Sequence, residues 1–143
     1  MDSIKIDSGI KRVLINDGPE VLEFNPSDVL FVEKFYAVVN EFDAKLANFS
    51  ARADELDEDK TVDENGLPAN VAARIAFLRD VCSFANGRID FLFGEGTAQK
   101  LFNGVESLDM IEQFFNGLTP FVQRTREAKV AKYSAKKSSK TLK

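Results

Sequence analysis

The feature that most constrains the fold is a pair of long segments in which apolar residues recur every three or four positions. In residues 25–56 these positions are Phe31, Phe35, Val38, Phe42, Leu46, Phe49, Ala53 and Leu56. In residues 70–93 they are Val71, Ile75, Leu78, Cys82, Ala85, Ile89 and Leu92. This spacing places the members of each set on one side of an α-helix. We therefore predict two long helices whose apolar faces pack against each other.

The segment between these helices, residues 57–69, is acidic and predicts a solvated loop. A connector of this length lets the chain reverse, so the two helices should be antiparallel. A calcium loop is the alternative, because Asp59 and Asp63 have the spacing of its first and fifth positions. However, Glu64 stands where an EF-hand needs glycine, and Asn70 stands where it needs a closing glutamate. No metal site is predicted.

Polar residues mark where both long helices begin. Asn25 precedes Pro26, which favours an asparagine N-cap followed by proline in the first turn. Asn70 is the corresponding cap for the second helix. Before them, residues 1–24 alternate between apolar and polar side chains and contain an Asn-Asp-Gly-Pro turn signal. We predict a small antiparallel β-hairpin or meander there. The fold class is mainly α, a helical bundle built on two long antiparallel helices.

A glycine-rich corner follows the second helix. Gly94 and Gly104 can adopt left-handed backbone conformations that end helices, and Thr97 is predicted to cap a short helix between them. Together with Gly96 and Lys100 these residues superficially resemble a phosphate-binding loop. The glycine spacing matches neither the Walker pattern nor the dinucleotide fingerprint, and no strand precedes the loop. The corner is therefore interpreted as structural, with no bound nucleotide or other cofactor.

Beyond the corner, Ser107 is predicted to cap a shorter helix that runs through Leu118 and ends near Gly117, and Thr119 and Pro120 begin a last helix. Residues 124–143 carry a net charge of +7 against −4 for the whole chain, which leaves −11 on residues 1–123. We predict a single globular domain over residues 1–123. The basic tail is predicted to be partly helical or disordered, because it is too polar to form a core.

The composition excludes several functional classes. The chain has no histidine and one cysteine, so the usual general base, metal ligand and disulfide partner are missing. Neither catalysis nor metal binding is predicted. Phenylalanine is far more frequent than tyrosine, and tryptophan is absent, which favours apolar packing or apolar partner contacts. The sequence predicts no secretory signal and no membrane span.

Two segments resemble a known family. Residues 93–97, Phe-Gly-Glu-Gly-Thr, follow an aspartate and precede Lys-Leu-Phe at residues 100–102 and then Gly104. Residues 24–28, Phe-Asn-Pro-Ser-Asp, open the first long helix. Both segments are similar to tail assembly chaperones of long-tailed bacteriophages and prophages of Gram-positive bacteria. The resemblance implies a protein of the host cytoplasm that binds and solubilises the tape measure protein and assists tail tube assembly. It also implies absence from the mature virion.

Within this hypothesis we expect client contacts from Phe93, Phe102, Phe115 and Phe121, which surround the corner and the last helices. Two alternatives remain open. The apolar stripes could instead join copies of the chain as a structural helical subunit or homo-oligomer. The basic tail could bind nucleic acid, although the acidic body would repel it and no aromatic residues alternate with the tail lysines for base stacking.

Overall fold

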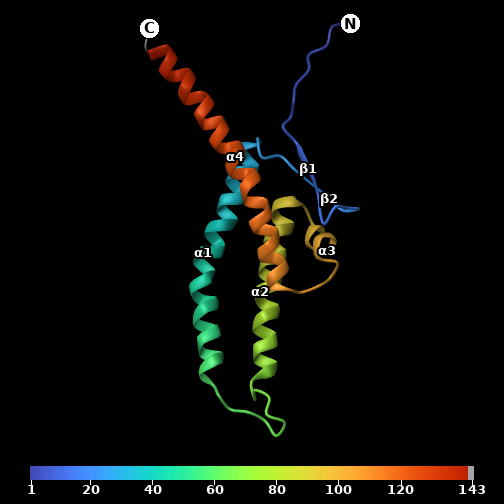
Figure 1. Ribbon diagram of the computed structural model, residues 1–143, viewed down its shortest axis with the longest axis vertical. Helices are drawn as coiled ribbons and strands as arrows, with labels where there is room; N and C mark the ends of the chain where they lie inside the picture. The colour runs from blue at the N-terminus through green and yellow to red at the C-terminus, as the bar shows by residue number, and fades with distance from the viewer. Residues whose placement is uncertain (142–143) are drawn as a thin grey trace. The chain divides into compact units, whose positions relative to one another are not determined.

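The computed structural model describes the backbone of residues 1–141 and the side chains of residues 1–124. The elements in chain order are β1 (Lys11–Leu14), β2 (Val21–Phe24), α1 (Val29–Glu58), α2 (Val71–Phe93), α3 (Thr97–Phe102) and α4 (Leu108–Thr141) (Figure 1). This order confirms the predicted mainly helical fold with a small N-terminal antiparallel sheet.

The chain divides into two compact units. One unit combines Met1–Glu33 with Glu112–Lys143, and the other comprises Lys34–Ile111. Helices α1 and α4 each contribute to both units. The units are described separately below.

The two strands of the first unit form an antiparallel hairpin in which Leu14 pairs with Val21. Asn16 and Asp17 both adopt positive φ in the turn, as the sequence signal predicts for a tight hairpin. Leu22 and Phe24 of β2 are buried, whereas Val21 is exposed. The covered face of β2 is therefore formed by Leu22 and Phe24.

Aromatic contacts give this hairpin a helical cover. The Phe24 ring centroid lies 5.8 Å from that of Phe31 in the first turn of α1 and 6.1 Å from that of Phe121 in α4. Leu118 and Val122 of α4 are also buried. A two-stranded sheet is marginal in isolation, so these contacts supply the apolar partner that it needs.

Helix α1 begins three residues later than the sequence predicted its first helical turn. The Asn25 side chain accepts a hydrogen bond from Ser27 N at 2.9 Å, which closes a turn that precedes the helix. Asp28 then caps α1, because its Oδ1 accepts from Leu30 N at 3.0 Å and its carbonyl accepts from Val32 N. The assignment of the N-cap to Asn25 was therefore wrong, and the Asn-Pro pair shapes the approach to the helix.

Helix α4 corrects a second prediction. Ser107 caps it as expected, with its Oγ 3.3 Å from Met110 N. The expected break near Gly117 does not occur, and Pro120 lies inside one continuous helix. Burial of Leu118 and Val122 on either side holds the chain in the helical course despite the unfavourable propensity of glycine and proline. The backbone of the predicted tail is helical to Thr141, while its side chains beyond residue 124 lie outside the described ones.

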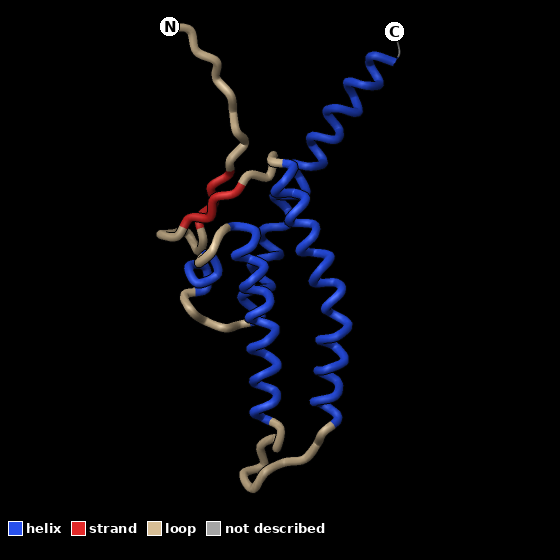
Figure 2. Tube along the Cα trace, turned by 180° about the vertical axis from the view of Figure 1, so that it is seen from behind, coloured by secondary structure: helices blue, strands red, loops and turns tan. Residues whose placement is uncertain are grey.

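In the second unit, α1 and α2 run antiparallel side by side, and the loop between them closes one end (Figure 2). They touch through aromatic rings. The Phe84 centroid lies 5.2 Å from that of Phe42 and 6.0 Å from that of Phe49, and Phe49 lies 6.2 Å from Phe77. The pairing was predicted, but α2 uses phenylalanines that are not part of its predicted apolar stripe.

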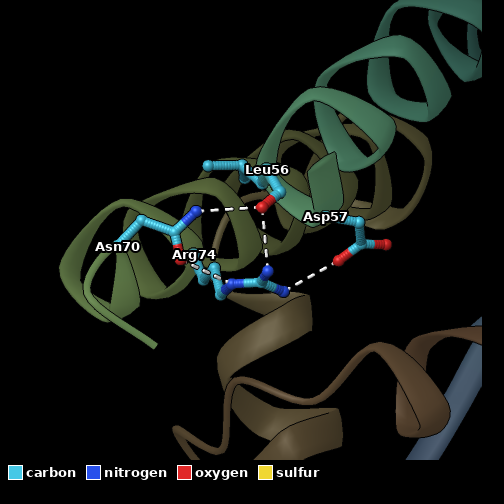
Figure 3. Close-up of polar contacts among 4 residues, drawn as sticks. All are labelled: Leu56, Asp57, Asn70 and Arg74. Atoms are coloured by element: carbon cyan, nitrogen blue, oxygen red, sulfur yellow. Dashed lines mark hydrogen bonds and ion pairs between the residues drawn. The ribbon is translucent and has the colours of Figure 1, made fainter. Parts of the chain in front are cut away.

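At the loop end of this hairpin, Asn70 does not cap α2 with its side chain as predicted. Its Nδ2 donates to the Leu56 carbonyl at 2.9 Å, and its Oδ1 accepts from Arg74 Nε at 2.8 Å (Figure 3). Only the Asn70 carbonyl takes the expected role, by accepting from Arg74 N at 3.0 Å. The side chain instead joins the start of α2 to the end of α1.

Candidate functional site

The apolar stripe of α2 is covered over only half of its length. Its C-terminal members Cys82, Ala85, Ile89 and Leu92 are buried, and α3 packs against α2. Glu106, which follows α3, lies 3.2 Å from Arg79 in an ion pair. The N-terminal members Val71, Ile75 and Leu78 continue the same stripe but are 43%, 53% and 45% exposed. The cover therefore ends at about Cys82.

The α1–α2 hairpin has two different edges. Along one edge, cations lie over aromatic rings: Lys45 Nζ is 4.8 Å from the Phe84 centroid, and Lys34 Nζ is 5.5 Å from the Phe91 centroid. Arg88 also stacks on Phe91 at 5.1 Å and pairs with Glu41 at 3.1 Å. This edge therefore combines cation–ring contacts with one ion pair, and the Phe91 ring remains 46% exposed.

The other edge is aliphatic and open. Leu46 follows Lys45 by about 100° around α1, which turns it away from the cation-lined edge. It is 64% exposed. On α2, Ile75 and Leu78 lie in line with Cys82, the member of the stripe at which burial begins, and both are exposed. We name the set Leu46, Val71, Ile75 and Leu78 the open apolar face.

The surroundings of the open apolar face are acidic. Asp43 and Asp54 are exposed on α1, and the acidic loop adjoins its far end. Residues 40–80 contain ten acidic and five basic residues, a net charge of −5. An apolar surface with an acidic rim is suited to a ligand that combines apolar side chains with positive charge.

The four predicted contact residues are divided between the two units. Phe93, the last residue of α2, is half-buried, whereas Phe102 of α3 is only 5% exposed and forms core. In the first unit, Phe115 is half-buried beside Phe114, with ring centroids 5.5 Å apart. Phe121 is 36% exposed and packs edge-on against Phe24. Phe102 is thus unsuitable for client contact, and neither unit contains all four residues.

The corner has the predicted positive φ angles at Gly94 (110°) and Gly104 (79°), and Gly96 also has a positive φ of 90°. Its capping differs from the prediction. The Thr97 hydroxyl donates backwards to the Gly94 carbonyl at 2.7 Å, whereas the Ala98 amide donates to Asp90 Oδ1 at 2.9 Å. Asp90 therefore caps α3 from the preceding helix, and the corner is held by bonds within the chain.

The carboxylates and the thiol of the described residues are the groups that a metal site or a reactive cysteine would require. No group of three or more cysteine, aspartate or glutamate residues in this part of the chain is placed to hold a metal ion. In the acidic loop, Asp63 Oδ1 accepts from Asn65 N at 2.9 Å and from Leu67 N at 3.0 Å, so this carboxylate shapes the turn. Burial raises the pKa of the Cys82 thiol, with a further contribution from Glu106. A thiol with a raised pKa is a poor nucleophile at neutral pH.

Sequence reasoning identified the apolar stripe of α2 but missed which part of it would remain uncovered. A second pattern was available. Phe77, Phe84 and Phe91 are spaced by seven residues, which places them on one line along the helix, offset from the stripe. This second line meets α1, and the N-terminal part of the first line is therefore free to form the open apolar face.

Within the described residues, no helix is both long and apolar enough to cross a membrane. No curated protein matches the chain. No solved structure matches it either. A family model does match residues 18–143, which is most of the chain, and the protein accordingly belongs to the family of unknown function DUF6673.

Proposed function

We propose that this protein is a tail assembly chaperone of a long-tailed bacteriophage or prophage, which binds and solubilises the tape measure protein. The single observation that carries the proposal is the open apolar face, a helical apolar stripe that loses its cover at Cys82 and continues as Ile75 and Leu78. The resemblance of residues 24–28 and 93–104 to such chaperones supports the same assignment.

An amphipathic client helix suits this face. Its anchors at positions i, i+3, i+4 and i+7 would lie beside the aliphatic side chains of α1 and α2, and the hairpin would become a local three-helix bundle. Fully burying a leucine or isoleucine contributes about 1.5–3 kcal/mol, and these side chains are already half-covered, so each would contribute about 1 kcal/mol. Binding of this strength remains reversible, as a chaperone that leaves its client requires.

Phe93, Phe115 and Phe121 are secondary contact candidates under this proposal, because each retains exposed ring surface. The acidic charge of residues 1–123 would keep client-bound copies apart by repulsion. The proposed setting is the host cytoplasm before tail completion, with the tail tube protein as the second partner. The proposal includes no catalytic step and no cofactor.

The test is a pull-down of the tagged protein from phage-producing host cells, with bound proteins identified by mass spectrometry. Recovery of a very long helical tape measure protein is the expected result. The double variant Ile75→Lys/Leu78→Lys should lose that protein while keeping its helical circular dichroism spectrum. Leu67→Lys is the matched control, because Leu67 is 55% exposed but lies in the loop. Recovery of no tape measure protein by the unaltered chain would refute the proposal.

The variant Phe115→Asp provides an independent check on the secondary contacts. Lost client binding with an unchanged melting temperature would assign Phe115 to the client surface. A lower melting temperature would instead assign this half-buried ring to the core of the first unit.

A further inference from the structure

We propose that the open apolar face also binds the basic C-terminal part of α4, residues 124–141, from a second copy of the chain. Two observations carry this inference. The face is apolar, uncovered and surrounded by a net charge of −5 over residues 40–80. The backbone of α4 continues as a helix to Thr141, and residues 124–143 have a net charge of +7.

Charge favours the basic part of α4 over the α1–α2 hairpin of a second copy as the ligand of the open apolar face. Two α1–α2 hairpins placed face to face would bring together two regions of net charge −5, and like charges at close range oppose association. The C-terminal part of α4 has the opposite charge. It is the strongly basic segment of a chain that is otherwise acidic, so the protein contains both halves of a complementary pair.

The residue types also match. Lysine can lay its methylene stem on an apolar surface while its ammonium group reaches the polar rim. The open apolar face offers such a surface beside the exposed carboxylates of Asp43 and Asp54. The sequence of the basic segment adds Val130 and Tyr133, three positions apart, which share one side of a helix. A lysine-rich helix with a small apolar contact is therefore the expected ligand.

This contact would be heterologous, because each copy provides one face and one basic segment. Repetition closes into a ring or continues as an open chain, according to the rotation between neighbours. Association should increase with protein concentration and weaken with salt, since the ionic part is exposed to solvent. The inference concerns contacts between copies and does not depend on the identity of a client.

The experiment measures the mass of the full-length protein by sedimentation velocity over a range of concentrations, at low and high salt. Two full-length variants separate the two surfaces. Ile75→Lys/Leu78→Lys alters the face, and Lys132→Glu/Lys136→Glu alters the basic segment. Reversing these two charges should weaken association by about tenfold. The matched controls are Leu14→Lys/Val21→Lys, exposed aliphatic residues of the β-hairpin, and Lys5→Glu/Lys11→Glu, which makes the same charge change elsewhere.

The expected result is a mass above that of the monomer for the unaltered protein and both controls, and a monomer for each surface variant. Mixing the two surface variants should restore a complex that stops at one copy of each, because one supplies an intact face and the other an intact basic segment. A monomer at every concentration for the unaltered protein would overturn the proposal. Undiminished association of Lys132→Glu/Lys136→Glu would also overturn it, in favour of a symmetric contact between faces.

Discussion

The guanidinium of Arg74 on α2 lies 2.8 Å from the Asp57 carboxylate in the last turn of α1. The same group donates through Nη2 to the Leu56 carbonyl, also at 2.8 Å (Figure 3). A carbonyl in the last turn of a helix has no partner within that helix, so Arg74 satisfies it while fixing the start of α2. One side chain thus joins the two helices at the end that carries the open apolar face.

Replacing Arg74 should loosen this end of the hairpin. Arg74→Ala removes hydrogen bonds to Asp57, Leu56 and Asn70, and we expect the free energy of unfolding to fall by about 1–2 kcal/mol. Asp57→Asn is the control. Its side chain is 64% exposed, so the loss should stay below about 1 kcal/mol. Urea denaturation measures the free energy of unfolding of both variants. Equal losses would show that the ion pair with Asp57, and not the hydrogen bond to the Leu56 carbonyl, is the main contribution of Arg74 to stability.

The cap of α3 gives a second prediction. Asp90→Ala should destabilise the protein by about 1 kcal/mol, because it leaves the Ala98 amide without its acceptor. Thr97→Val should have a smaller effect, since the threonine hydroxyl donates to the Gly94 carbonyl and caps no amide. Chemical denaturation of both variants compares them directly. A larger loss for Thr97→Val would support the cap that the sequence predicted.

These caps show where sequence reasoning succeeds and where it stops. The helix boundaries near Asn25, Asn70 and Thr97 were predicted within a few residues, because polar caps and glycines are local signals. The atoms that satisfy the amides were not predicted. Asp28 and Asp90 accept these hydrogen bonds, and both are visible in the sequence as polar residues near a helix start. Which of several neighbouring polar side chains caps a helix depends on the path of the chain in three dimensions.

For the open apolar face, too, the local pattern was predictable from the sequence but the tertiary cover was not. The periodicity of Ile75 and Leu78 is identical to that of Cys82 and Ala85, so the sequence correctly places all four on one line. Burial depends on the length of the covering segment, and periodicity carries no information about it. The helix boundary predicted at Pro120 was wrong for a related reason. Packing of the neighbouring turns of α4 overrides the preference of proline for the start of a helix.

Phe102 should behave as core. It is 5% exposed within a short helix that is held in place by packing, so Phe102→Ala should lower the free energy of unfolding by about 3 kcal/mol. Phe91→Ala is the comparison, because Phe91 is 46% exposed and should lose less. Thermal or urea unfolding measures the difference. A stable Phe102→Ala variant with reduced client recovery would restore Phe102 as a contact residue.

Two glycines should respond to alanine in opposite directions. Gly87 lies inside α2, and an added Cβ would meet nothing within 4 Å, so Gly87→Ala should stabilise the protein by about 0.5–1 kcal/mol. Gly96 also has open space, but its φ of 90° disfavours any Cβ, so Gly96→Ala should destabilise by about 1–2 kcal/mol. Differential scanning calorimetry should show melting temperatures that move apart. A shift of both in the same direction would contradict the conformational argument.

Cys82 should make stability depend on pH in the alkaline range. Burial, with help from the Glu106 carboxylate, raises the pKa of the folded thiol above its value of about 8.5 in unfolded chains. The folded state therefore holds the proton more tightly. This contribution is fully present below the unfolded pKa and is lost as pH rises through the folded pKa.

Urea unfolding of the unaltered protein should thus show declining stability above about pH 8.5, more steeply than the variant Cys82→Ala, which lacks the thiol. Iodoacetamide supplies a second measurement, because alkylation of the native protein requires local opening and should be slow until denaturant is added. If Cys82→Ala follows the same alkaline decline, other groups cause it. Rapid alkylation of the native protein would show that the covered half of the α2 stripe opens readily.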